Sequence, residues 1–241
     1  MELFISELVG SLVFLLGGYT YMSNVTLKNT QLPGLKWVDL SFAWSLAVGF
    51  GLAISCIMPQ GMGLLNPGVV VGQLLVGAIT PAQAGYALLG EFLAAGLAVA
   101  LTVINFYDSF KESEGINKAG IFSAGPVKRN LGLNFLQEIC ATFLFPLLVL
   151  GCIKGCSGLG AEKALVIGLI GFAAVFFLSL TLNLTGFSMN AMRSVFSSIW
   201  FAILPIPQKN GEKVDWTYQL VVNLVGSTLG GALACWAVTL F

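Results

Sequence analysis

The chain has 241 residues, of which 57% are hydrophobic and 9% are charged, and its formal net charge is zero. Soluble domains carry about 25% charged residues, so this composition indicates a membrane protein. The neutral charge balance gives no argument for a nucleic-acid partner. Histidine is absent, which removes the commonest general base and metal ligand. The sequence therefore predicts no enzyme activity, no metal site and no cofactor.

Six apolar segments are long enough to cross a bilayer, which takes about 20 residues. They cover about 3–22, 37–58, 83–106, 133–153, 162–182 and 216–240. Two shorter apolar segments, about 67–77 and 191–203, reach only halfway across at about 1.5 Å per residue. Backbone at membrane depth must be buried in protein or line a wet cavity. We therefore predict an all-α membrane protein with six transmembrane helices and two re-entrant half-helices.

An asparagine opens each half-helix. The first segment begins Asn66-Pro67-Gly68 and the second begins Asn190-Ala191-Met192. Asparagine is a good N-cap, and proline suits the first helical position, where no amide donor is needed. Ala191 keeps the second helix but lacks the ring that presets φ. Both motifs therefore predict a helix N-terminus inside the membrane.

The irregular stretch before each asparagine is expected to expose backbone carbonyls to a pore. These pore-lining residues are Gly63, Leu64, Leu65, Ser188 and Met189. Each helix N-terminus carries about half a positive charge. Two such ends that face one point repel protons and cations, while asparagine amides bind a passing hydroxyl or water. This pattern favours passage of a neutral solute.

The two halves of the chain repeat one another. Three matching pairs occur in the same order: Glu7 with Glu138, Asn66 with Asn190, and Gly90 with Gly226. Repeat one covers about 1–110 and repeat two about 131–241, with a polar connection over 107–130. Each repeat holds an odd number of spans, so the second enters the membrane from the opposite side. We expect a single transmembrane domain over 1–241 with an inverted repeat.

Several ionisable side chains lie at membrane depth. Arg193 follows the second asparagine, where an arginine is costly and functional by default. As a permanently charged fork of donors, it can bind solute hydroxyls and repel cations. Glu7, Glu91 and Glu138 could form a proton relay or could brace the irregular loops by accepting their amides. Bracing is favoured because Glu7 and Glu138 repeat with the fold.

With these motifs, the chain resembles the major intrinsic protein family of aquaporins and glycerol facilitators over about residues 3–240. Within the family it is most similar to bacterial glycerol facilitators. The resemblance implies an aquaporin-like fold and a passive channel for glycerol-like polyols, water or both, which excludes ions and protons. It also implies a homotetramer of separate pores in the lipid bilayer of the plasma membrane. Both termini would then be cytoplasmic.

The resemblance places the selectivity filter at Trp44, Leu178, Phe187 and Arg193. An aromatic corner beside an arginine suits glycerol, because the rings contact its carbon backbone and the guanidinium binds its hydroxyls. Some positions depart from the family pattern. Leu64 replaces a histidine, Leu178 replaces the glycine of glycerol channels, and Ser194 replaces an aspartate. The second motif has lost its proline and carries Met192 in place of alanine.

Two alternatives remain open at this stage. Met192 and Leu178 could narrow or close the pore, which would leave a non-conducting protein with a structural or interaction role, or one retuned for another solute. A coupled transporter also uses inverted repeats and broken helices, but it needs a titratable group on the path. The family orientation places only Lys154 and Lys163 of the loop cations in the cytoplasm. The positive-inside rule favours the reverse orientation.

Overall fold

The computed structural model describes residues 1–32, 34, 36–155, 158–160, 162–209 and 211–240, and every regular element in these ranges is helical. Six helical segments are long and apolar enough to cross a membrane. They are α1 (Glu2–Thr26), α2 (Trp37–Ile57), α4 (Pro81–Asn105), α7 (Leu131–Gly155), α8 (Lys163–Thr181) and the last span, Trp216–Val238. The predicted spans are confirmed, with ends that differ by a few residues.

The last span is continuous but not uniform. It consists of α10 (Trp216–Tyr218), the π-helical stretch η2 (Gln219–Gly226) and α11 (Ser227–Val238). The π-helical pairing was not predicted, because side-chain periodicity does not separate it from an α-helix over so few turns.

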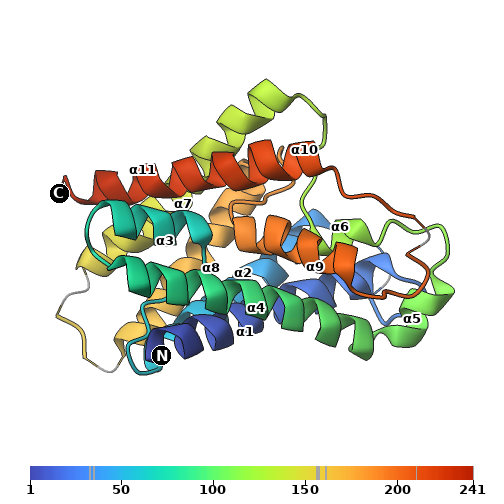
Figure 1. Cartoon of the computed structure of the whole chain (residues 1–241), viewed down its shortest axis with the longest axis horizontal. Coiled ribbons are helices and arrows are strands. Elements are labelled where there is room, and N and C mark those ends of the chain that lie inside the picture. Colours follow the sequence, from blue (N-terminus) through green and yellow to red (C-terminus); the bar gives the residue numbers. More distant parts are fainter. Residues whose placement is uncertain (33, 35, 156–157, 161, 210, 241) are drawn as a thin grey trace.

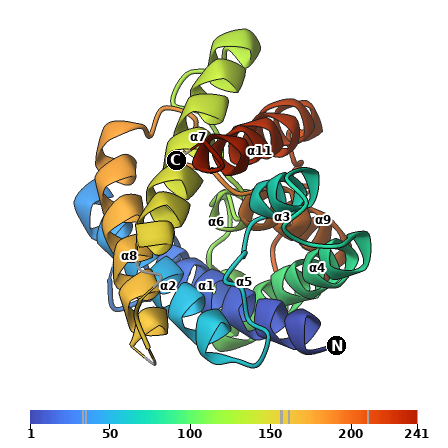
Figure 2. The same ribbon diagram turned by 90° about the vertical axis from the view of Figure 1, so that its left-hand side faces the viewer.

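Two short helices occupy the interior of the bundle. The first is α3 (Pro67–Leu75), and the second consists of the π-helical stretch η1 (Met192–Phe196) followed by α9 (Ser197–Ile203). In Figure 1, α3 and α9 lie end to end between α4 and α11, and the end-on view of Figure 2 shows one in front of the other. This arrangement confirms two re-entrant half-helices.

Each half-helix packs on a span of the opposite repeat. α3 packs chiefly against α11, and α9 packs against α4. Glycine makes the first contact possible: a Cβ on Gly68 would lie 2.6 Å from the backbone oxygen of Ser227, and one on Gly231 would lie 2.6 Å from the backbone carbon of Gly68. The two halves are therefore interlocked through their half-helices.

The inverted repeat is visible in matching helix crossings. α1 packs against α4, and α7 packs against the last span. A Cβ on Gly90 would lie 2.7 Å from Phe4 O and 3.4 Å from the Cβ of Glu7, and one on Gly226 would lie 3.4 Å from the Cβ of Glu138. The glycine and glutamate pairs found in the sequence thus meet at equivalent places in the two halves.

The polar connection between the repeats contains two short helices, α5 (Tyr107–Glu112) and α6 (Ala119–Phe122). Glu212 fixes α6, because its Oε2 accepts hydrogen bonds from the backbone N–H groups of Lys118 (2.7 Å) and Ala119 (2.8 Å). The ring of Phe122, which lies in α6, is buried in the main apolar cluster. The connection is therefore part of the packed structure at one end of the bundle.

Candidate functional site

The two asparagines meet where the half-helices begin. Asn66 Oδ1 accepts the N–H of Gly68 (2.9 Å), and Asn190 Oδ1 accepts the N–H of Met192 (2.9 Å). Each side chain therefore caps its own helix, as expected for asparagine. The same two amides also reach across the junction: Asn66 Nδ2 donates to Met189 O (2.8 Å) and Asn190 Nδ2 donates to Leu65 O (2.7 Å). The helix N-termini thus face each other in the interior.

The residue before each asparagine has a left-handed backbone. Leu65 has φ 43° and Met189 has φ 48°, a conformation that most side chains avoid. This bend turns the Leu65 and Met189 carbonyls toward the opposite asparagine. Leu65 and Met189 line the cavity described below, and each carbonyl also accepts a hydrogen bond from an asparagine amide of the other half.

Two repeat-related glutamates lie behind the irregular loops. Glu7 accepts the backbone N–H groups of Leu64 (3.1 Å, Oε1) and Leu65 (2.8 Å, Oε2). Glu138 Oε1 accepts the N–H of Met189 (2.6 Å). These bonds satisfy buried amides that no helix pairs. This geometry is what loop bracing requires.

Glu91 differs from the other two glutamates. It is fully buried, and neither of its carboxylate oxygens has a hydrogen-bond partner within the described part of the chain. Glu91 therefore makes no loop hydrogen bond as short as those of Glu7 and Glu138. Its carboxylate lies near the backbone N–H of Asn66, at the start of the first half-helix.

Three of the four predicted filter residues come together. The guanidinium carbon of Arg193 lies 4.6 Å from the ring centroid of Trp44, and Arg193 Nη1 donates to Phe187 O (3.0 Å). The backbone of Phe187 is left-handed, with φ 56°. Among the described residues, no carboxylate forms an ion pair with Arg193. Arg193 therefore offers a cation next to two aromatic side chains.

A narrow cavity runs from these residues to the junction of the half-helices. Its polar side chains are Ser188, Asn190 and Arg193. Its apolar wall consists of Phe14, Trp44, Val48, Leu52, Leu64, Leu65, Phe145, Val175, Phe187 and Met189. A second, wider cavity opens beyond Leu64, which lines both. Leu64, where the family pattern has histidine, thus lies between the two cavities.

Several predicted pore residues do not line the first cavity. They are Gly63, Asn66, Pro67, Gly68, Leu178, Ala191 and Met192. Most of these shape the ends of the half-helices and are buried. Asn66 is almost fully buried, and its role at the junction is the hydrogen bond that its side-chain amide donates to Met189 O.

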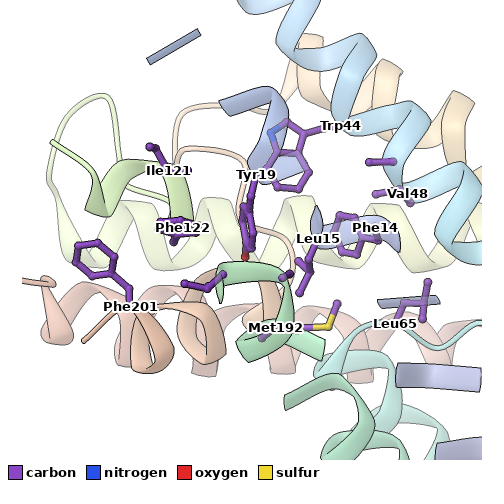
Figure 3. Close-up of a cluster of buried hydrophobic side chains, with 14 of the residues drawn as sticks. Phe14, Leu15, Tyr19, Trp44, Val48, Leu65, Ile121, Phe122, Met192 and Phe201 are labelled. Atoms are coloured by element: carbon purple, nitrogen blue, oxygen red, sulfur yellow. The ribbon is translucent and has the colours of Figure 1, made fainter. Parts of the chain in front are cut away.

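Met192 and Leu178 are the two residues for which the sequence left open that they narrow or close the pore. Met192 is fully buried in the apolar cluster that includes Leu15 and Tyr19 (Figure 3). Leu178 is 1% exposed and packs in a separate cluster with Ala141 and Met189, while Val175 of the same helix lines the cavity. The structure thus corrects the placement of both side chains, since helix packing directs them away from the cavity.

Sequence reasoning missed five residues of the cavity wall: Phe14, Val48, Leu52, Phe145 and Val175. The sequence did contain a pattern from which some of these residues could have been predicted. Val48 and Leu52 follow Trp44 at four-residue intervals, which places them on one helix face. Phe14 and Phe145 each follow a repeat-related glutamate by two helical turns, so they are also repeat mates. The cavity therefore has an aromatic ring from each repeat.

Six spans, two half-helices that meet at their N-termini and a cavity along their junction define a membrane channel with an inverted repeat. The model of the major intrinsic protein family matches residues 1–238, and the chain belongs to this family. It is accordingly a multi-pass integral membrane protein.

Named relatives match the chain over nearly its whole length. Glycerol uptake facilitator protein 2 of Lactiplantibacillus plantarum is 33% identical over 238 aligned positions, covering 97% of each chain. A glycerol uptake facilitator protein of Streptococcus pneumoniae is 30% identical over 246 aligned positions, covering 100% of this chain and 99% of the relative. The X-ray structure of the aquaglyceroporin from Plasmodium falciparum has a TM-score of 0.79 at 21% identity, covering 100% and 99% of the two chains. This likeness supports the fold.

Proposed function

We propose that the chain is a passive channel for glycerol-like polyols and water, with a filter formed by Trp44, Phe187 and Arg193. The observation that carries the proposal is the cavity that begins at these three residues and ends at Asn190. Its relatives in Lactiplantibacillus plantarum and Streptococcus pneumoniae are glycerol uptake facilitators.

The cavity has the two surfaces that a polyol needs. The rings of Trp44 and Phe187 contact the carbon backbone, while the guanidinium of Arg193 donates to hydroxyl oxygens. One of its N–H groups already binds Phe187 O, and the remaining donors are available to the solute. Because a planar fork binds two oxygens at once, neighbouring hydroxyls of glycerol match it well.

The same groups oppose ions. Arg193 has no carboxylate partner among the described residues, so its charge repels cations at one end of the cavity. At the other end, the N-termini of α3 and η1 face each other across the two hydrogen bonds that the Asn66 and Asn190 amides donate to Met189 O and Leu65 O. Their partial positive charges raise the energy of a proton or metal ion at that point.

The alternatives receive less support. Met192 and Leu178 do not line the cavity, so the reason for a non-conducting protein disappears. Coupled transport needs a titratable group on the path, whereas Glu7 and Glu138 are engaged with loop amides and lie outside the cavity wall.

The proposal extends to assembly and topology. The chain forms one channel domain of two repeats, works as a homotetramer with a pore in each protomer, and lies in the plasma membrane with both termini cytoplasmic. The family resemblance supports these points, while the distribution of loop lysines opposes the orientation. Labelling of single cysteines placed in the loops of intact cells decides the orientation.

Purified protein in liposomes tests the function. Stopped-flow light scattering should show faster glycerol equilibration than in empty vesicles, with final glycerol concentrations equal inside and outside. A proton gradient across the membrane should not change that end point. Equal rates with and without protein would refute a channel, and accumulation against the glycerol gradient would identify a coupled transporter. Arg193→Val should reduce the preference for glycerol over water if the filter is assigned correctly.

A further inference from the structure

Tyr19 of α1 contacts two filter residues without lining the cavity. It is fully buried, and its hydroxyl donates to the backbone oxygen of Arg193 (2.7 Å). The same hydroxyl also contacts Ser197 Oγ, which donates to Met192 O (3.1 Å). Tyr19 thus joins α1 to the first turns of the second half-helix.

The ring of Tyr19 lies between Trp44 and Phe122 (Figure 3). It meets the Trp44 ring edge to face, with centroids 5.8 Å apart and planes at 81°, and the Phe122 ring at 5.2 Å and 76°. Edge-to-face contacts at these distances are the preferred aromatic arrangement. One side chain therefore holds the indole of Trp44 by its ring and the backbone of Arg193 by its hydroxyl.

The segment that carries Arg193 needs such a restraint. Arg193 lies in the π-helical stretch η1, where the hydrogen bonds differ from those of an α-helix and are rare outside functional sites. The guanidinium donates a hydrogen bond to Phe187 O, and no carboxylate among the described residues pairs with it. A shift of the backbone at Arg193 would therefore move the guanidinium relative to Trp44.

We infer that Tyr19 is a positioning residue of the filter, which fixes the spacing between the Arg193 guanidinium and the Trp44 indole and thereby sets the preference for glycerol over water. The inference rests on the proposed filter. Tyr19 itself does not touch the solute, because it does not line the cavity.

The test is Tyr19→Phe, which removes the hydroxyl and keeps the ring. In proteoliposomes with equal amounts of protein, the ratio of glycerol to water permeability should fall about fivefold, the factor that corresponds to one neutral hydrogen bond. The ratio of erythritol to glycerol permeability should rise, because a loosened filter discriminates less by size. The control is Thr102→Val, which removes a fully buried hydroxyl from a different helix, α4. It should leave both permeability ratios unchanged.

The ratios separate positioning from a merely structural role. If Tyr19→Phe lowers glycerol and water permeability in the same proportion, or changes neither, the inference is refuted. Arg193→Lys, measured alongside, keeps the charge and removes the planar fork. A lower glycerol preference in this variant together with an unchanged Tyr19→Phe would refute the role of Tyr19 alone. An unchanged preference in Arg193→Lys would refute the filter and the inference with it.

Discussion

Asn66 and Asn190 each hold the loop of the opposite repeat. Asn66 Nδ2 lies 2.8 Å from Met189 O, and Asn190 Nδ2 lies 2.7 Å from Leu65 O, while each Oδ1 caps its own helix. The two side chains therefore form one symmetric junction. Loss of either amide would leave a buried carbonyl of the other repeat without its partner.

This junction predicts non-additive effects of Asn66→Ala and Asn190→Ala. Each single variant should lose a helix cap, at about 1 kcal/mol, and should also weaken the opposite loop. The double variant should cost less than the sum, since the first substitution already disrupts the shared junction. Thermal unfolding of the purified protein in detergent measures all three variants. Additive costs would mean that the two caps are independent.

The sequence predicted the junction in part. Apolar length and the two asparagines predicted the spans, the half-helices and the meeting of their N-termini, because local chemistry determines them. The loss of proline at Ala191 is harmless, since its φ of −63° matches the value that proline imposes. The left-handed Leu65 and Met189 could not be predicted, because their carbonyls turn to accept hydrogen bonds from asparagine amides of the other repeat.

The directions of the Met192 and Leu178 side chains could not be predicted from the sequence either. A family resemblance aligns positions along the chain, but which way a side chain points depends on the packing of its helix. The π-helical pairing of η1 changes the angular position of the residues in that stretch. Repeat symmetry, by contrast, contained unused information, since Phe14 and Phe145 could have been found from Glu7 and Glu138.

Gly68→Ala would restore the alanine of the family motif, yet it should destabilise this protein. The new Cβ would lie 2.6 Å from Ser227 O, a backbone atom of the adjoining span. Overpacking of this kind costs about 1–3 kcal/mol. Gly85→Ala is the matched control, because a Cβ at this position in α4 meets nothing within 4 Å. If Gly68→Ala proved as thermally stable as Gly85→Ala, the tight crossing of α3 and α11 would be wrong.

Met192→Ala should cost stability without increasing solute flux. The Met192 side chain is fully buried in the apolar cluster and does not line the cavity. Truncation of a buried methionine typically costs about 2–5 kcal/mol. Glycerol permeability per folded protein, measured by stopped-flow scattering, should remain that of the unsubstituted chain. A large gain in permeability would show that Met192 obstructs the path, as the motif alone suggested.

Gly18→Ala should displace the Trp44 ring. A Cβ on Gly18 would lie 2.0, 2.2 and 2.4 Å from three atoms of that ring. The indole must therefore move, and the filter should lose selectivity between glycerol and water. Gly132→Ala, at a helical position where a Cβ meets nothing within 4 Å, supplies the comparison. If Gly18→Ala left the selectivity between glycerol and water unchanged, Trp44 would not be part of the filter.

The ion pair between Arg129 and Asp215 predicts a pH effect on stability. Arg129 Nε donates to Asp215 Oδ2 (2.8 Å), and this bond lowers the pKa of Asp215 below its ordinary value. A lowered folded pKa contributes stability above about pH 4, the unfolded value, and this contribution is lost as the pH falls through the folded pKa. Asp215→Asn keeps a side-chain oxygen that can cap Tyr218.

The asparagine variant should therefore unfold at a slightly lower temperature than the parent chain at pH 7, since both partners are about half exposed. The difference should shrink as the pH falls from about 4 to about 2, where the parent carboxylate becomes protonated. Melting curves across this pH range provide the check. A difference that grew on acidification would have the wrong sign for this pair.

The central claim is that neutral solutes cross along the cavity while protons do not. The most direct measurement follows glycerol equilibration by light scattering and proton leak by an enclosed pH dye in the same proteoliposomes. Glycerol equilibration should be much faster than in empty vesicles, with proton leak equal to that of empty vesicles. Glycerol flux no faster than in empty vesicles, or proton leak that rises with protein content, would contradict the account.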